Sequence, residues 1–170
     1  MELSERFLVR RLRRGERDAC RELIRAHHGA VYGYLRRLGA DAPLAEDLSQ
    51  EIEIMEQEAL HLDMGDSRVS VPDYMKEIIA EITHHARQSP DVNQRSGVSV
   101  RASVANYEAL LANAFRRALR VGETEVVPRI SDLPFIVPSL QGKVEFEAME
   151  DGQEARIMDR LIQSAVKAVF

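Results

Sequence analysis

The chain has 170 residues, of which 45% are hydrophobic and 30% charged, with a formal net charge of −5. This composition is typical of a globular protein with one domain or two small ones, and it excludes a membrane protein and a disordered tail. No apolar run approaches the roughly 20 residues that span a bilayer, and no signal segment is recognisable, so we expect a cytoplasmic protein without membrane contact. The single cysteine, Cys20, leaves no internal disulfide and no cysteine pair for a metal.

Positive charge is concentrated at the start of the chain. Residues 1–50 hold 10 Arg and 8 Asp or Glu, so the remaining residues hold 13 basic and 20 acidic side chains. A surplus of two positive charges is too small to bind DNA by itself. With no Trp and 5% aromatic residues, the chain also lacks a stacking platform for single-stranded nucleic acid.

The first 60 residues predict a helical hairpin with extensions, which we take as the first domain. Apolar residues three and four apart indicate helices over about 4–15, 16–39 and 41–59. Asp41 is placed to cap the third helix, and Pro43 suits its first turn.

Residues 6–51 carry a resemblance to a known family. The segment FLVRRLRRGERDACRELIRAHHGAVYGYLRRLGADAPLAEDLSQE resembles the start of region two of an extracytoplasmic-function sigma factor of the sigma-70 family. In that family the part similar to AEDLSQE docks on the clamp coiled coil of RNA polymerase. The resemblance therefore implies that Asp47, Gln50 and Glu51 face the polymerase core, where carboxylates and amides suit a basic partner helix. The alternative is that Glu46, Asp47 and Glu51 belong to a solvated acidic face.

The chain departs from this family after Glu51. A sigma factor continues into an aromatic and basic helix that melts and reads the promoter, whereas IEIMEQEALHLDMGDSRVSVPDYM is acidic and lacks Trp and Phe. No helix-turn-helix pattern follows, so we expect no sequence-specific DNA binding.

The second half predicts a helical domain over 72–170, after a linker at 61–71. Pro72 is placed to open a helix, the segment SPDVNQRSGVSV reads as a loop, and Ser99 caps a long helix that ends near Gly122.

The remaining elements are shorter. Three prolines around Ser131 leave room for only a short helix, the alternation over 143–148 allows one short strand, and a final helix carries apolar residues over 157–169. The expected fold class is therefore mainly α, a helical hairpin followed by a helical bundle, with at most this short strand.

Residues 69–170 resemble a second family. The segments VPDYMKEIIAEI, SPDVNQRSGVSVRASVANYEALLANAFRRALRVGE and VPRISDLP are similar to the C-terminal helical lid of magnesium-chelatase-like AAA+ ATPases. Within GVSVRAS, Arg101 takes the position of the lid's second sensor arginine, which implies a contact with nucleotide phosphates beside a helix N-terminus. The alternative is a solvent-exposed arginine near a helix start.

The chemistry of an autonomous enzyme is missing from the sequence. The only Gly-Lys pair, Gly142 and Lys143, lacks the flanking pattern of a phosphate-binding loop, and no apolar strand ends in an Asp-Glu pair for Mg²⁺. We also find no metal-ligand spacing and no catalytic triad, so no catalytic or metal residues are predicted. ATP with magnesium is expected only together with a partner ATPase domain, and no cofactor is expected on the chain alone.

The two family resemblances meet near residue 51, so the sequence has the pattern of a chimera. A natural gene fusion, a recombined reading frame and laboratory joining would each produce such a junction. The leading hypothesis is a non-catalytic helical protein that joins a truncated sigma-factor-like segment, able to bind RNA polymerase core, to an AAA+ lid. The second is a transcription protein that binds the polymerase clamp without reading promoter DNA and competes with true sigma factors. The third is an accessory part of an AAA+ ring that lends Arg101 to ATP bound by a partner subunit.

Overall fold

A computed structural model describes the chain in seven stretches, which are residues 28–33, 35–37, 39–59, 67–93, 95–140, 142–147 and 153–170. Within these stretches the protein is mainly helical, as the sequence predicts. The helix expected at 4–15, and the first part of the one expected at 16–39, lie outside the described residues. No helix in the described stretches combines the length and the apolar character that crossing a bilayer requires.

The chain divides into two compact units, residues 1–53 and 54–170, which are described separately. The division falls within helix α3 (Ala42–Glu58), seven residues before the end that the sequence analysis gave to its first domain. This difference arises because the last turn of α3 has its contacts with the following helices: the Lys76 ammonium lies 2.6 Å from a carboxylate oxygen of Glu56.

The start of α3 follows from local chemistry. The Asp41 carboxylate accepts a hydrogen bond from the backbone N–H of Leu44 at 2.9 Å, which satisfies one of the free amides of the first turn, as predicted. Just before it, Gly39 has a φ of 101°, a left-handed conformation that favours glycine and lets the chain turn between two helical segments. Along α3 the predicted apolar stripe is largely buried, with Leu44 half-buried and the others buried, namely Leu48, Ile52, Met55 and Ala59.

Residues 54–170 are built around two long helices, α4 (Asp73–Gln88) and α5 (Val100–Val121). Pro72 directly precedes α4, and α5 ends at Gly122, whose φ of 76° allows the left-handed cap that the sequence predicts. After α5 come the 3₁₀ helix η2 (Ile130–Ile136), the single turn α6 (Val137–Leu140) and the C-terminal helix α7 (Gln153–Val169).

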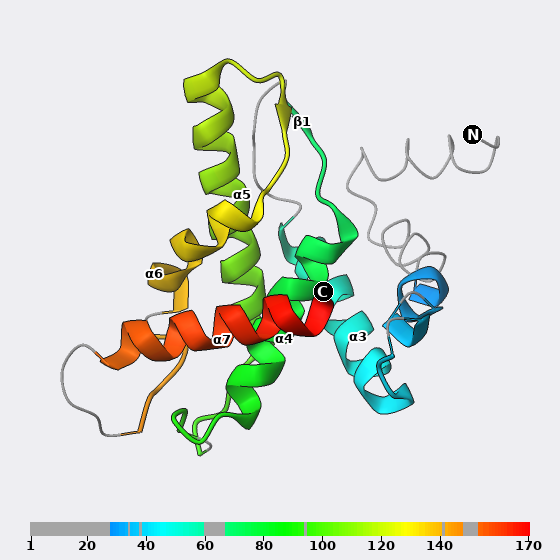
Figure 1. Ribbon diagram of the computed structural model, residues 1–170, viewed down its shortest axis with the longest axis vertical. Coiled ribbons are helices and arrows are strands. Elements are labelled where there is room, and N and C mark those ends of the chain that lie inside the picture. Colours follow the sequence, from blue (N-terminus) through cyan, green and yellow to red (C-terminus); the bar gives the residue numbers. More distant parts are fainter. Residues whose placement is uncertain are drawn as a thin grey trace. The chain divides into compact units, whose positions relative to one another are not determined.

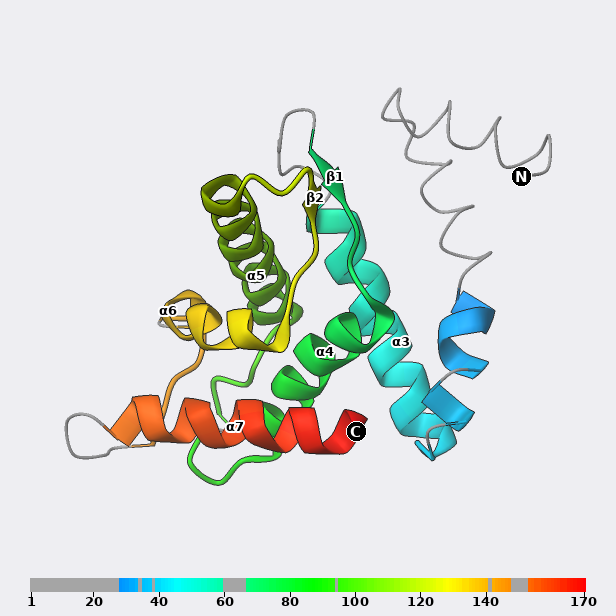
Figure 2. The same ribbon diagram turned by 45° about the horizontal axis from the view of Figure 1, so that its top comes forward.

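The helices of residues 54–170 bury apolar side chains between them. Helix α4 packs against α7 and α5, while α5 packs against η2 and α6, and Figures 1 and 2 show α7 crossing α4. The side chains with at most 2% exposure among these helices come from every one of them except α6, and they include Met75, Ile78, Ile79, Ile82, Leu110, Leu133, Ile136 and Ile157. Each such side chain stabilises the fold by about 1.5–3 kcal/mol relative to an exposed one.

The short strand lies elsewhere than predicted. Strand β1 (Arg68–Val69) pairs in parallel with β2 (Glu125–Val126), whereas over 142–147 Val144 and Phe146 are isolated bridge residues, Phe146 pairing with Val92. The end of the expected linker at 61–71 therefore contributes a strand to the second unit. The alternation of Val144 and Phe146 reflects packing on the apolar cluster around Val92 rather than a place in a sheet.

Candidate functional site

The loop between α4 and α5 leads directly to the predicted sensor arginine, and it is fastened at its base. The Asp91 carboxylate accepts a hydrogen bond from the Arg160 guanidinium of α7 at 3.0 Å. The backbone N–H of Asn93 donates to the carbonyl of Glu145, and the N–H of Glu147 donates to the carbonyl of Asp91. Two segments distant in sequence, α7 and residues 145–147, thus hold the loop.

The first turn of α5 is held by its buried side. Val98 and Ala102 are 7% and 0% exposed, and the Arg87 guanidinium donates to the Val98 carbonyl at 2.9 Å. Ser99, the predicted cap, stands at the N-cap position with extended backbone but makes no side-chain capping bond. Arg101 lies in this first turn and is exposed. An exposed guanidinium therefore stands beside helix amides that Ser99 leaves uncapped, an arrangement favourable to anions.

The three residues predicted to contact polymerase lie on α3 but in different environments. Asp47 and Gln50 are exposed, whereas Glu51 is 5% exposed. The Gln50 amide donates to the Glu46 carboxylate at 3.1 Å, a contact along the helix surface. The structure therefore places two of the predicted side chains at the surface and buries the third at the edge of the apolar stripe.

A histidine links the preceding helical segment to α3. The His28 ring lies with Nδ1 2.7 Å from a Glu53 carboxylate oxygen and Nε2 3.5 Å from one of Glu46. Its ring stacks on Tyr32, with centroids 6.3 Å apart. From the sequence Glu46 was considered only as part of a solvated acidic face and Glu53 was not considered, although their spacing of seven residues puts them on one face of a helix.

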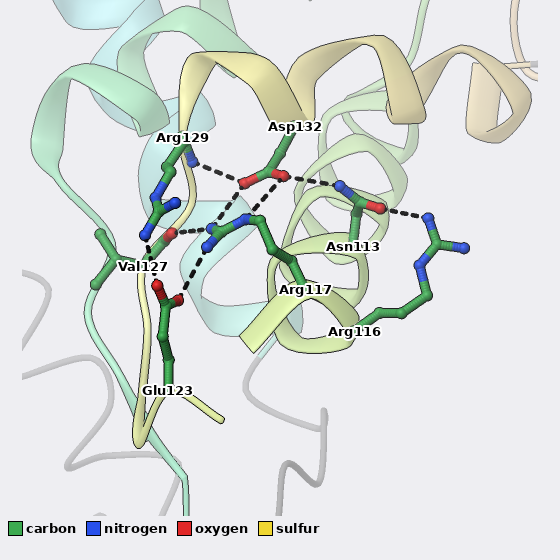
Figure 3. A network of polar contacts seen from close by, with 7 residues as sticks. All are labelled: Asn113, Arg116, Arg117, Glu123, Val127, Arg129 and Asp132. Carbon is green, nitrogen blue, oxygen red and sulfur yellow. Dashed lines mark hydrogen bonds and ion pairs between the residues drawn. The ribbon is translucent and has the colours of Figure 1, made fainter. Parts of the chain in front are cut away.

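The most extensive polar cluster joins α5 to η2, and the sequence analysis did not predict it (Figure 3). At its centre the Asp132 carboxylate, 3% exposed, accepts hydrogen bonds from the Arg117 guanidinium at 3.1 and 3.4 Å and from the Asn113 amide at 2.8 Å. The backbone N–H of Arg129 donates to the same carboxylate at 2.9 Å, which caps η2. Four donor contacts compensate the burial of one charge.

Three further contacts extend this cluster outward. The Arg117 guanidinium also donates to the Glu123 carboxylate at 3.0 Å and to the Val127 carbonyl at 2.6 Å, and the Arg129 guanidinium pairs with Glu123 at 2.8 Å. Hydrogen bonding to Asp132 raises the pKa of Arg117 above its usual value, which keeps the cation charged. The cluster thus fixes the chain segment that returns from α5, and its role is structural.

A second group that the sequence analysis missed lies on α4. Glu77 and Glu81, one turn apart, are 5% and 6% exposed, and the Glu77 Oε2 atom has no hydrogen-bond partner in the described structure. Burial, together with the nearby Glu81 charge, raises the pKa of Glu77 to about 7. Burial also raises the pKa of Glu81, against the opposing effect of His84 and His85.

This group does not form a metal site. Within the described residues, no three or more His, Cys, Asp and Glu side chains are arranged to hold a metal ion. The Lys143 ammonium donates to the Ser139 carbonyl of α6 at 2.9 Å.

Comparison with known proteins adds no relative: no protein-family model matches the chain, and no curated protein or solved structure is significantly similar to it. The two family resemblances therefore stay predictions.

We expect Asp132→Asn to lower the free energy of unfolding by about 2–4 kcal/mol, because the Arg117 cation loses its buried counter-charge. The measurement is urea unfolding followed by circular dichroism. Glu123→Gln is the matched control, since its carboxylate is 31% exposed and its loss should cost about 1 kcal/mol or less. Equal costs for the two variants would show that Asp132 is not the centre of the cluster.

The raised pKa of Glu77 gives a pH dependence with a defined sign. The carboxyl binds its proton more tightly in the folded chain than at its ordinary pKa of 4.5, so the free energy of unfolding falls as pH rises from about 4.5 through 7. Glu77→Gln should make this pH-dependent decrease in the free energy of unfolding smaller by about 1–3 kcal/mol. Urea unfolding at pH 5 and pH 8 measures it, and an unchanged difference between the two pH values contradicts the assignment.

Proposed function

We propose that the chain is a non-catalytic helical protein that binds RNA polymerase core through a sigma-factor-like segment and carries an AAA+ lid-like domain behind it. The observation that carries the proposal is the exposed pair Asp47 and Gln50, one turn apart on α3. Helix α3 has six carboxylates and neither Lys nor Arg, namely Glu46, Asp47, Glu51, Glu53, Glu56 and Glu58. The part of this helix around the exposed Asp47 and Gln50 complements a basic partner helix.

The three predicted residues have different roles in this proposal. Asp47 and Gln50 contact the partner directly, because their side chains are accessible. Glu51 is 5% exposed, so its side chain offers a partner little accessible surface. Promoter DNA is not read, since the aromatic and basic helix of a sigma factor has no counterpart in the sequence.

The test is a pull-down of polymerase core by the purified chain. We expect the wild type to bind, and Asp47→Ala/Gln50→Ala to bind at least about tenfold more weakly, because two central polar contacts are lost. Glu58→Ala, which removes an exposed carboxylate at the other end of α3, is the control and should bind like the wild type. A folded wild type that does not bind polymerase, or a double variant that binds equally well, contradicts the proposal.

The position of Arg101 favours a second candidate function. Arg101 is an exposed residue in the first turn of a 22-residue helix, and the loop that precedes this helix is fastened to α7. A guanidinium in this position is suited to reach phosphates held by another subunit. In this alternative the chain does not hydrolyse ATP alone. It lends Arg101 to ATP and magnesium bound by an AAA+ partner.

A complementation assay tests this alternative. The partner is a magnesium-chelatase-like ATPase whose own sensor arginine has been replaced, and the readout is phosphate release. Adding the chain should raise the rate by about tenfold or more, whereas Arg101→Ala should not. Arg156→Ala, an exposed arginine of α7, should act like the wild type. Rescue by Arg101→Ala as strong as that by the wild type would rule out the sensor role.

A further inference from the structure

The outward side of α5 ends in a surface that combines exposed apolar and basic side chains. Leu119 is 64% exposed, Phe135 of the adjoining η2 is 51% exposed, and Arg116 and Arg120 are exposed on the same side of α5 as Leu119. We refer to Arg116, Leu119, Arg120 and Phe135 as the basic face. Side chains three and four residues apart on a helix are neighbours, so the three α5 residues form one continuous patch.

Arg116 is held in place within this face. Its guanidinium donates to the Asn113 side-chain oxygen at 2.6 Å, and Asn113 in turn donates to the buried Asp132. The guanidinium carbon also lies 5.3 Å from the centre of the Phe135 ring. The Arg116 cation is therefore oriented before any ligand arrives, which lowers the entropy cost of binding.

The charge of the basic face is uncompensated. Arg117 and Arg129 are neutralised by their ion pairs with Asp132 and Glu123. Among the residues that the structure describes, Arg116 and Arg120 make no ion pair. Two positive charges beside exposed apolar side chains select a ligand that carries carboxylates around an apolar side chain.

The chain itself carries a surface with this chemistry on the last two turns of α3. Ile54 is 39% exposed and Glu58, four residues later, is exposed, so they lie on one side of a helix that has no basic residue. Ile54 and Leu119 are both uncovered in the same compact unit, so neither covers the other within one molecule. We propose that the Ile54 and Glu58 surface of one molecule docks on the basic face of a second copy.

This contact joins two different surfaces, so a pair of molecules keeps one free basic face, on one molecule, and one free Ile54 and Glu58 surface, on the other. Such a head-to-tail contact continues into rings or open chains rather than stopping at a symmetric dimer. Because Asp47 and Gln50 lie outside it, self-association is a separate property from the polymerase contact proposed above.

Sedimentation velocity of the full chain at increasing concentration tests the proposal, using two charge-reversed variants. In Leu119→Glu/Arg120→Glu the basic face becomes acidic, and in Ile54→Arg/Glu58→Arg the acidic surface becomes basic. We expect the wild type to associate with rising concentration and each variant alone to associate at least about tenfold more weakly. An equimolar mixture of the two variants should associate again, because each reversed surface then meets a partner of opposite charge.

The matched control is Ala155→Glu/Arg156→Glu on α7, which makes the same change in charge at two exposed neighbouring positions. It should associate like the wild type, and circular dichroism should show equal helix content in all four proteins. A wild type that stays monomeric, variants that associate as well as the wild type, or a mixture that stays monomeric would each overturn the proposal.

Discussion

The buried Asp132 carboxylate is the constraint on which the arrangement of the second unit depends. A charge at 3% exposure is tolerated only where several donors surround it, and here they come from α5 and from the first residue before η2. Because Asn113 and Arg117 of α5 donate hydrogen bonds to this carboxylate, they hold η2 against the C-terminal half of α5. The same cluster also fixes the segment that forms β2, because Arg117 bonds at the same time to the carbonyl of Val127.

The same arrangement divides α5 into regions with different tasks. Its middle supplies the core, where Leu110 and Ala114 are fully buried. The first turn presents Arg101 beside uncapped amides, and the last turns present exposed arginines around Leu119. One helix, anchored by its buried side, thus holds two groups of cations in fixed positions at its opposite ends, and each is suited to a different anionic partner.

Local sequence signals were enough to predict most helix boundaries. Asp41 before Pro43, Pro72 before α4, and Gly122 after α5 each act on backbone groups within a few residues, so their effect does not depend on the rest of the fold. The two-residue strands could not be predicted in this way. Such short segments have no measurable periodicity, and their pairing joins Arg68 to Glu125, which lie on either side of α4 and α5 in the sequence.

The polar residues were predicted less well than the helices, since burial of a charge depends on distant contacts. Glu51 resembles a surface residue by type, yet it stands three residues after Leu48 and four before Met55, on the edge of the buried stripe. That spacing indicates burial of Glu51 from the sequence alone. The position of Glu77 directly before the buried Ile78 is a similar indication. For Asp132 the signal was its place three residues after Arg129, at a helix start, whereas its bond to Arg117 comes from the tertiary fold.

The position of α7 at the end of the described chain has a consequence for folding during synthesis. Helix α4 packs extensively against α7, although α5, η2 and α6 are made between them. On the ribosome, α4 and α5 therefore emerge while part of the apolar side of α4 is still uncovered. The unit reaches its final core only when α7 leaves the exit tunnel, so it completes folding late, as expected for contacts between distant parts of a sequence.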